Sequence, residues 1–458
     1  MFDRAVAGPD APPASLGRDP RFPFLGMALS PGQMREFFNR VALPFLCPGR
    51  EAGPVRIRTM VYRPGSKCAF VYAFHFTDTL AGPEQWAVVT FDKGKGLESA
   101  FYDDPHGPDA SDGWPRGGAV YLREYWCRVE LFPRDGYLPS LPMAADPSQM
   151  AALFDRLAIG SGRPAIDVLS YRPHRRCVLK YVRASPAETT EVVGRVYRPG
   201  PRAARIGYKM ARLRLHGAAH GLTVPRLLCV EDAWNLLLQE WVPGVPLPQV
   251  LAAAKTRSEA AGPVRLAAAG LAALHSFPLD VPEMDVQSLE GELARMRGRA
   301  RKLQEVAPRL AEQASALLAG LAPLAQGHIG IEPTFVHDDC KPAHYLTQED
   351  GRVAVIDLDR ACLGDPAVDV GKFMAGLNEI AVRTGADHLR TLDEVFLEEY
   401  QARASDDGVA LRARLAQVIT LVRNAMSRFR SAPYSDFGEP SLLPSLLLQE
   451  AAACFPRR

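Results

Sequence analysis

The sequence lacks three features that would assign it to whole classes of protein. It has no uninterrupted apolar run of about 18 residues, the length a membrane helix needs. Its eight cysteines are scattered, with no CxxC pair and no histidines at zinc spacing, which predicts reduced thiols rather than disulfides or a structural zinc site. The 54 basic and 52 acidic side chains leave a net charge of only +2. Charge alone therefore indicates no nucleic-acid or membrane partner.

What is present is typical of a globular protein. Hydrophobic residues make up 47% and charged residues 23% of the 458 residues, a length that predicts two to three domains. Residues 1–18 are rich in Pro, Ala and Gly and carry acidic side chains, which predicts a flexible tail rather than a signal peptide. We expect a cytoplasmic protein.

The first half of the chain contains an internal repeat. Residues 19–42 match residues 135–158 in register, sharing Asp, Pro, Leu, Met, Ala, Gln, Phe and Arg. The segment VYRPGSKCAFVYAF (61–74) is likewise similar to SYRPHRRCVLKYVR (170–183). Two matches in the same order predict a duplicated unit.

Periodicity divides the chain into three parts after the tail. Residues 19–134 and 135–242 each begin with a Pro-led helical segment that is followed by β-rich runs between Pro and Gly turns. Residues 243–458 are dominated by Ala- and Leu-rich helical periodicity. A polar segment at residues 335–371 interrupts these helices and contains the residues suited to chemistry.

This segment consists of two acidic loops, each at the end of an apolar strand. The first is FVHDDCKPAHYL (335–346), and the second is VAVIDLDRACLGDPAVDVG (353–371). A carboxylate in the first loop can accept a proton from an attacking hydroxyl, while one in the second holds a divalent metal on a nucleotide. The pair predicts phosphoryl transfer.

The same pattern resembles the aminoglycoside phosphotransferase and choline kinase-like family, which shares the protein-kinase fold. The resemblance implies that Asp339 is the catalytic base, that Lys341 lies near the transferred phosphate, and that Asp357 binds magnesium. It also implies that His337 and Asp369 brace the catalytic loop.

Other parts of the resemblance concern the nucleotide. The segment LLLQEWVPGVPL resembles the hinge between the two lobes, where the backbone of Glu240 and Val242 would bind adenine. Arg195 takes the place of the phosphate-binding lysine, and His344 replaces the asparagine that would be the second magnesium ligand. The basic turn RPHRR (172–176) replaces the glycine-rich loop.

Several of these residues have simpler interpretations. Arg195 could form a salt bridge, His344 could be a hydrogen-bonded core imidazole, and the arginines of 172–176 could form a solvated turn. Asp359 and Asp365 are interpreted as turn caps. Cys340, beside the proposed base, is interpreted as a packed thiol.

We therefore predict an α+β, protein-kinase-like two-lobe fold with an additional N-terminal module that duplicates the small lobe. The predicted function is ATP- and Mg²⁺-dependent transfer of the γ-phosphate to a hydroxyl of a small molecule, such as a sugar or an aminoglycoside. The alternative is a pseudokinase that only binds a nucleotide or metabolite. A protein kinase is disfavoured because eleven residues between Asp357 and Asp369 leave little room for an activation loop.

The acceptor itself is not determined by the sequence. The stretch 283–326 is predicted to line the acceptor pocket, but its acidic residues are interspersed with arginines. The N-terminal module has no catalytic loop, and we expect it to have a structural or substrate-capping role. The oligomeric state is not predicted.

Overall fold

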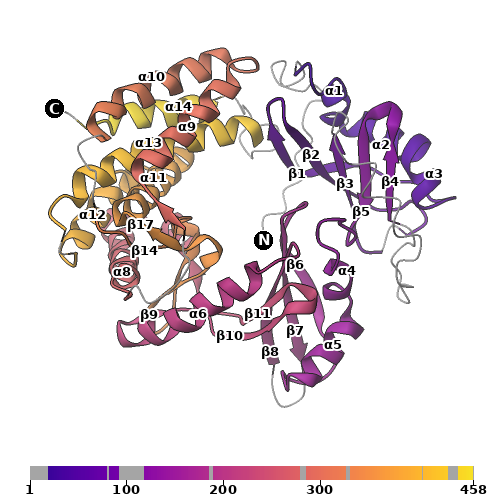
Figure 1. Ribbon diagram of the computed structural model, residues 1–458, viewed down its shortest axis with the longest axis horizontal. Helices are drawn as coiled ribbons and strands as arrows, with labels where there is room; N and C mark the ends of the chain where they lie inside the picture. Colours follow the sequence, from indigo (N-terminus) through magenta and orange to yellow (C-terminus); the bar gives the residue numbers. More distant parts are fainter. Residues whose placement is uncertain are drawn as a thin grey trace.

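The computed structural model describes residues 19–79, 82–91, 118–184, 189–278, 285–325, 331–404, 406–431 and 442–456. Two units, each built on a five-stranded sheet, precede a mostly helical part (Figure 1). The α+β class and the protein-kinase-like fold predicted from the sequence are confirmed. The predicted tail, residues 1–18, lies outside the described residues.

The first unit packs short helices on one face of an antiparallel sheet with the strand order β1-β2-β3-β5-β4. The side chains of strand β2 point alternately to the two faces of the sheet. Phe70, Tyr72 and Phe74 pack with the helices, while Val71 belongs to a different core on the opposite face. The elements are α1 Leu25–Ala28, α2 Pro31–Phe37, a π-helical turn Phe38–Ala42, α3 Leu43–Leu46, β1 Arg56–Arg63, β2 Lys67–Phe74, β3 Gln85–Phe91, β4 Ala119–Leu122 and β5 Cys127–Leu131.

The second unit has the equivalent strand order, β6-β7-β8-β11-β10. Helix α5 begins as the sequence predicts, with Asp146 as N-cap and Pro147 at the first position. The elements are α4 Leu141–Ala144, α5 Pro147–Arg156, β6 Ala165–Arg172, β7 Arg176–Ala184, β8 Thr189–Tyr197, α6 Arg202–Ala219, β10 Leu227–Glu231 and β11 Leu236–Glu240.

The two units also share buried hydrogen bonds at equivalent positions. The Tyr62 hydroxyl donates to Asp19 at 2.8 Å, and the Tyr171 hydroxyl donates to Asp135 at the same distance. The hydroxyls of Tyr72 and Tyr181 both donate to a backbone carbonyl of the preceding helical segment, at Ala28 and Ala144. Together with the strand order, these contacts lead us to infer that one unit is a duplicate of the other.

The helical part contains two small sheets with the orders β12-β15-β16-β9 and β13-β17-β14. In the described part of the chain, none of the helices has the length and apolar character needed to span a membrane. The helices are α7 Leu247–Ala253, α8 Arg257–His275, α9 Leu289–Leu303, α10 Pro308–Ala325, α11 Pro366–Thr384, α12 Leu392–Gln401, α13 Val409–Ser431 and α14 Leu442–Ala453. The strands are β9 Leu222–Thr223, β12 Val245–Pro246, β13 Val286–Gln287, β14 Thr334–Val336, β15 Tyr345–Thr347, β16 Val353–Val355 and β17 Cys362–Gly364.

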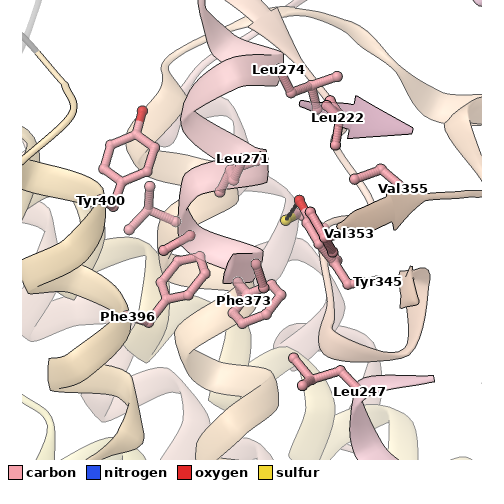
Figure 2. Packing of buried hydrophobic residues seen from close by; sticks show 14 of the residues in the cluster. Leu222, Leu247, Leu271, Leu274, Tyr345, Val353, Val355, Phe373, Phe396 and Tyr400 are labelled. Carbon is pink, nitrogen blue, oxygen red and sulfur yellow. Dashed lines mark hydrogen bonds between the residues drawn. The ribbon is translucent and has the colours of Figure 1, made fainter. Parts of the chain in front are cut away.

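One buried cluster holds the two acidic loops in place. Leu271 of α8, Tyr345 of β15 and Val353 of β16 pack with Phe373 of α11 and Phe396 of α12 (Figure 2). The rings of Phe373 and Phe396 are stacked with centroids 4.0 Å apart. Strands β15 and β16, which follow the first loop and precede the second, are therefore anchored on the helices.

The first unit contacts both of the other parts. Val71 and Val88 of its sheet share a core with α4, α5 and the second sheet. Phe429 of α13 packs against the core of the first unit, and strand β1 lies beside α13 (Figure 1). The first unit thus packs against both the second sheet and the helical part, although the chain itself runs directly from the second sheet to the helices.

Candidate active site

The first acidic loop is braced by a buried carboxylate in the first turn of α11. Asp369 accepts hydrogen bonds from the backbone N–H groups of His337 at 2.5 Å and Asp338 at 3.0 Å. The Nε2 atom of His337 in turn lies 2.9 Å from the carbonyl oxygen of Ile356, the residue that directly follows strand β16. The bracing role that the family resemblance implies for His337 and Asp369 agrees with these contacts.

Three side chains from the two loops converge at one point. His344 Nε2 lies 3.4 Å from Asp357 Oδ2 and 3.9 Å from Asp339 Oδ2. His344 Nδ1 lies 2.9 Å from the backbone oxygen of Asp339. Because a carbonyl only accepts hydrogen bonds, Nδ1 must carry the proton, and Nε2 presents a lone pair toward the carboxylates. Lys341 Nζ lies 3.3 Å from Asp339 Oδ2.

Two arginines of the second sheet bind the carboxylates of the second loop. Arg176 binds Asp357 through both terminal nitrogens, at 2.9 Å each, and also contacts Asp359. Arg195 Nη1 donates to Asp357 at 2.7 Å and to Asp359 at 2.9 Å. The Tyr197 hydroxyl donates to Asp359 at 2.8 Å. Of the two interpretations of Arg195, phosphate binding and a salt bridge, the structure shows a salt bridge. Its partner is Asp357, the proposed metal ligand.

These neighbours set the charge states of the site. Burial raises the pKa of the Asp357 carboxyl, but Arg195 and Arg176 lower it by more, so its pKa lies well below the usual range. Burial raises the pKa of Asp339, but its charged neighbours, Lys341 above all, bring it below its usual value. Burial, together with Lys341 and His337, lowers the pKa of His344 to about 3, so its imidazole is neutral at pH 7.

Sequence reasoning misplaced one residue of the site. Asp359 was interpreted as a turn cap, but it is 7% exposed and accepts from Arg195, Arg176 and Tyr197, because the second sheet lies over this loop. Asp365 is a cap as predicted, since it accepts from the N–H of Ala367 at the start of α11.

Sequence reasoning also missed the neighbour of the proposed base. Asp338 is 4% exposed, with Lys372 Nζ at 2.5 Å and Arg360 Nη2 at 2.5 Å. Its backbone adopts the left-handed conformation, with φ of 59°, which turns adjacent side chains in different directions. Asp339 therefore faces His344 and Asp357, while Asp338 is neutralised in the interior. Spacing alone gave no signal for Lys372 as its partner.

The predicted hinge connects the two parts of the molecule. Glu240 ends β11, and β12, which follows it, pairs with β15 of the helical part. Val242 is buried with Leu346 and Ala354 in a small apolar cluster. The Glu240 side chain accepts from Arg214 at 2.7 Å, and its backbone N–H donates to the carbonyl of Arg226 at 3.0 Å.

The interpretation of Cys340 as a packed thiol agrees with its environment. It is 1% exposed, and its sulfur lies 3.3 Å from the Tyr345 hydroxyl. Burial raises its pKa well above the usual value, which disfavours the reactive thiolate.

The donor set is partly suited to magnesium. Ligand atoms of Asp339, His344 and Asp357 all lie within 4.8 Å of one another. The two carboxylates are the hard oxygen donors that magnesium prefers, whereas the imidazole suits it less well. Both oxygens of Asp357 also accept from guanidinium groups, so a metal ion at this carboxylate would compete with Arg176.

The fold is kinase-like, and a comparison with family models identifies the class of protein. The model of the phosphotransferase enzyme family matches residues 179–417, more than half of the chain. The chain belongs to this family, as the sequence resemblance predicted. No curated protein matches it.

Solved structures of similar fold come from several kinds of kinase. The macrolide 2'-phosphotransferase MphH from Brachybacterium faecium is 20% identical, with 68% of this chain and 99% of that chain covered and a TM-score of 0.43. A thermostable mutant of the aminoglycoside phosphotransferase APH(4)-Ia, in a ternary complex with AMP-PNP and hygromycin B, is 15% identical, with 66% of this chain and 97% of that chain covered and a TM-score of 0.45. A choline/ethanolamine kinase family protein from Mesorhizobium loti is 14% identical, with 69% and 94% covered and a TM-score of 0.43.

The buried brace makes a specific prediction. Replacing Asp369 with Asn leaves one oxygen for the two N–H donors of His337 and Asp338, and we expect a loss of stability of about 1–3 kcal/mol. A lower thermal midpoint would show this. The matched control is Asp387→Asn, at a carboxylate that is 90% exposed, which should leave the midpoint unchanged. Equal midpoints for both variants would contradict the bracing role.

Proposed function

We propose that this protein is an ATP-dependent phosphotransferase that moves the γ-phosphate to a hydroxyl group of a small molecule. The observation that carries the proposal is the convergence of Asp339, His344 and Asp357 at the ends of strands that the family model covers. A carboxylate for the acceptor hydroxyl and a cation site for the nucleotide phosphates are the two parts that phosphoryl transfer requires.

Each residue has a role in this proposal. Asp339, ionised at neutral pH, orients the acceptor hydroxyl and accepts its proton. Asp357, with His344, holds Mg²⁺, which when bound offsets the charge of the phosphate oxygens. Lys341 and Arg195 add positive charge near the transferred group. The backbone of Glu240 and Val242 binds the adenine edge.

Arg176 exchanges partners in this account. Its guanidinium binds both oxygens of Asp357, at 2.9 Å each, and a phosphate group offers it the same forked arrangement of acceptors. Binding of the metal and nucleotide would free Arg176 from Asp357 and leave it available for the phosphates. The turn at 172–176 would then bind phosphate through side chains instead of the backbone amides of a glycine-rich loop.

The same arginines support a second candidate, a pseudokinase that binds a nucleotide or metabolite without transfer. Two guanidinium groups already balance the charge of Asp357, so its environment is stable without a metal. Nucleotide binding and turnover are therefore tested separately.

The first prediction concerns nucleotide binding. ATP with Mg²⁺ should raise the thermal midpoint of the wild type, because a ligand at 100 times its Kd stabilises the native state by about 2.7 kcal/mol. The magnesium-dependent part of the shift should be absent in Asp357→Ala and retained in the control Asp387→Ala. A magnesium-dependent shift of equal size in the wild type and both variants would show that the metal does not bind at Asp357.

The second prediction concerns turnover. Asp339→Ala should keep the nucleotide-dependent shift but lower the rate of phosphate transfer by about 10²- to 10⁴-fold, the usual contribution of a positioned base. Release of ADP in the presence of a pool of small hydroxylated compounds measures this rate. Nucleotide binding with no transfer by the wild type would favour the pseudokinase.

A further inference from the structure

A group of arginines lies where the two sheet units meet the helical part. The β1–β2 and β6–β7 hairpins are equivalent, and each has basic residues at the closing pair, Arg63 with Lys67 and Arg172 with Arg176. The two tips touch each other, since Lys67 Nζ lies 3.4 Å from His174 Nδ1. Because Arg176 reaches Asp357, this contact also brings the tip of the first unit to the edge of the proposed active site.

The helical part adds arginines from the opposite side. Arg360 follows the proposed metal ligand by three residues and binds Asp338, the neighbour of the proposed base. Arg299 projects from α9, within the stretch that the sequence predicts to line the acceptor pocket. Arg423 of α13 has Nη1 3.7 Å from Glu292 of α9, so α13 and α9 are adjacent here.

The charges of these arginines act on one another across the three parts. Arg299 is largely exposed, but the part of its side chain that is covered loses solvation, which lowers its pKa. Glu292 raises this pKa, and Arg423, Arg63 and Arg360 lower it further. Burial also lowers the pKa of Arg175, and Arg63, Arg172, Arg202 and Arg360 add to that effect. The contacts of the elements agree with this. The hairpin tips that carry Arg63 and Arg175 touch at Lys67 and His174, and β1, which ends at Arg63, lies beside α13, which in turn packs against α9 with Arg299.

The carboxylates nearby are already neutralised. Asp338 is bound by Lys372 and Arg360, and Glu292 by Arg295 and Arg423. Among the residues that the structure describes, the side chains of Arg63 and Arg175 form no hydrogen bond or ion pair. The site therefore has an excess of positive charge that the described part of the protein does not balance.

We propose that the acceptor is an anion, namely a small hydroxylated compound that already carries a phosphate group, and that Arg63, Arg175, Arg299 and Arg360 bind that group. This inference rests on the proposed phosphotransferase function and narrows its substrate class. A polycationic acceptor would be repelled, whereas guanidinium groups bind phosphate oxygens in pairs. The first unit completes the site by supplying Arg63. In this way it would have the substrate-capping role that the sequence analysis expects of it.

The reaction itself balances without a further reactant. The acceptor hydroxyl oxygen forms a bond to the γ-phosphorus, and the bond from that phosphorus to the β,γ-bridging oxygen breaks. ADP leaves with the bridging oxygen, and the hydroxyl proton passes to Asp339 and then to solvent. The phosphate that the acceptor already carries takes no part in the bond changes. It only holds the hydroxyl in place.

The test compares two double variants of the full chain that lose the same charge. Arg63→Ala with Arg299→Ala removes one arginine of the site from the first unit and one from α9. Arg40→Ala with Arg301→Ala is the control, at exposed positions of the same first unit and the same helix. All four side chains are exposed, so both variants should fold with the wild-type thermal midpoint.

The probes are glucose 6-phosphate, glucose and kanamycin, titrated calorimetrically in the presence of AMP-PNP and Mg²⁺. We expect glucose 6-phosphate to bind more tightly than glucose, and to bind the Arg63/Arg299 variant at least about tenfold more weakly than the control variant. Equal affinity for both variants, tighter binding of kanamycin, or no binding of glucose 6-phosphate at millimolar concentration would each overturn the proposal.

The nucleotide separates this proposal from the proposed function. If Mg²⁺ and ATP shift the thermal midpoint but the two double variants bind glucose 6-phosphate equally, only the anionic acceptor is wrong. If no nucleotide binds while glucose 6-phosphate still distinguishes the variants in a titration without AMP-PNP, the anion site stands and the phosphotransferase function is wrong.

Discussion

The ion pairs of Asp357 with Arg176 and Arg195 connect the helical part to the second sheet, the two parts that the proposed phosphate transfer would require. Asp357 lies in the helical part, and both arginines come from the second sheet. Arg195 is 6% exposed, and leaving such a charge without its partner costs about 3–5 kcal/mol. These ion pairs therefore hold the second acidic loop of the helical part against the second sheet. In our proposal, a magnesium ion bound at Asp357 would supply positive charge there in place of Arg176.

The first unit gives this arrangement a second support. The first unit lacks the acidic loops, but its β1–β2 hairpin meets the β6–β7 hairpin at Lys67 and His174. His174 is also buried against Glu130 of β5, with Nε2 3.0 Å from the carboxylate. The hairpin that carries Arg176 is thus held on one side by the first unit and on the other by Asp357. These contacts place the first unit next to the hairpin from which Arg176 reaches the site.

The sequence predicted the features that depend on neighbours along the chain. The two acidic loops were found because apolar strands end in carboxylates at 335–346 and 353–371. The duplicated unit was proposed because Tyr-Arg-Pro recurs in register. The targets of Arg176 and Arg195 were not found, because the residues in these contacts are 181 and 162 positions apart. Asp359 was misassigned for the same reason, since its partners come from a sheet that only the tertiary fold brings near.

The central claim is that Asp357 exchanges guanidinium groups for a metal ion and a nucleotide. A crystal structure of the wild type with Mg²⁺ and AMP-PNP tests it most directly. The account predicts a metal ion on Asp357, with His344 nearby and the Arg176 guanidinium on the phosphates. Nucleotide bound between the lobes with Arg176 still on both oxygens of Asp357, and no metal at that carboxylate, would contradict it.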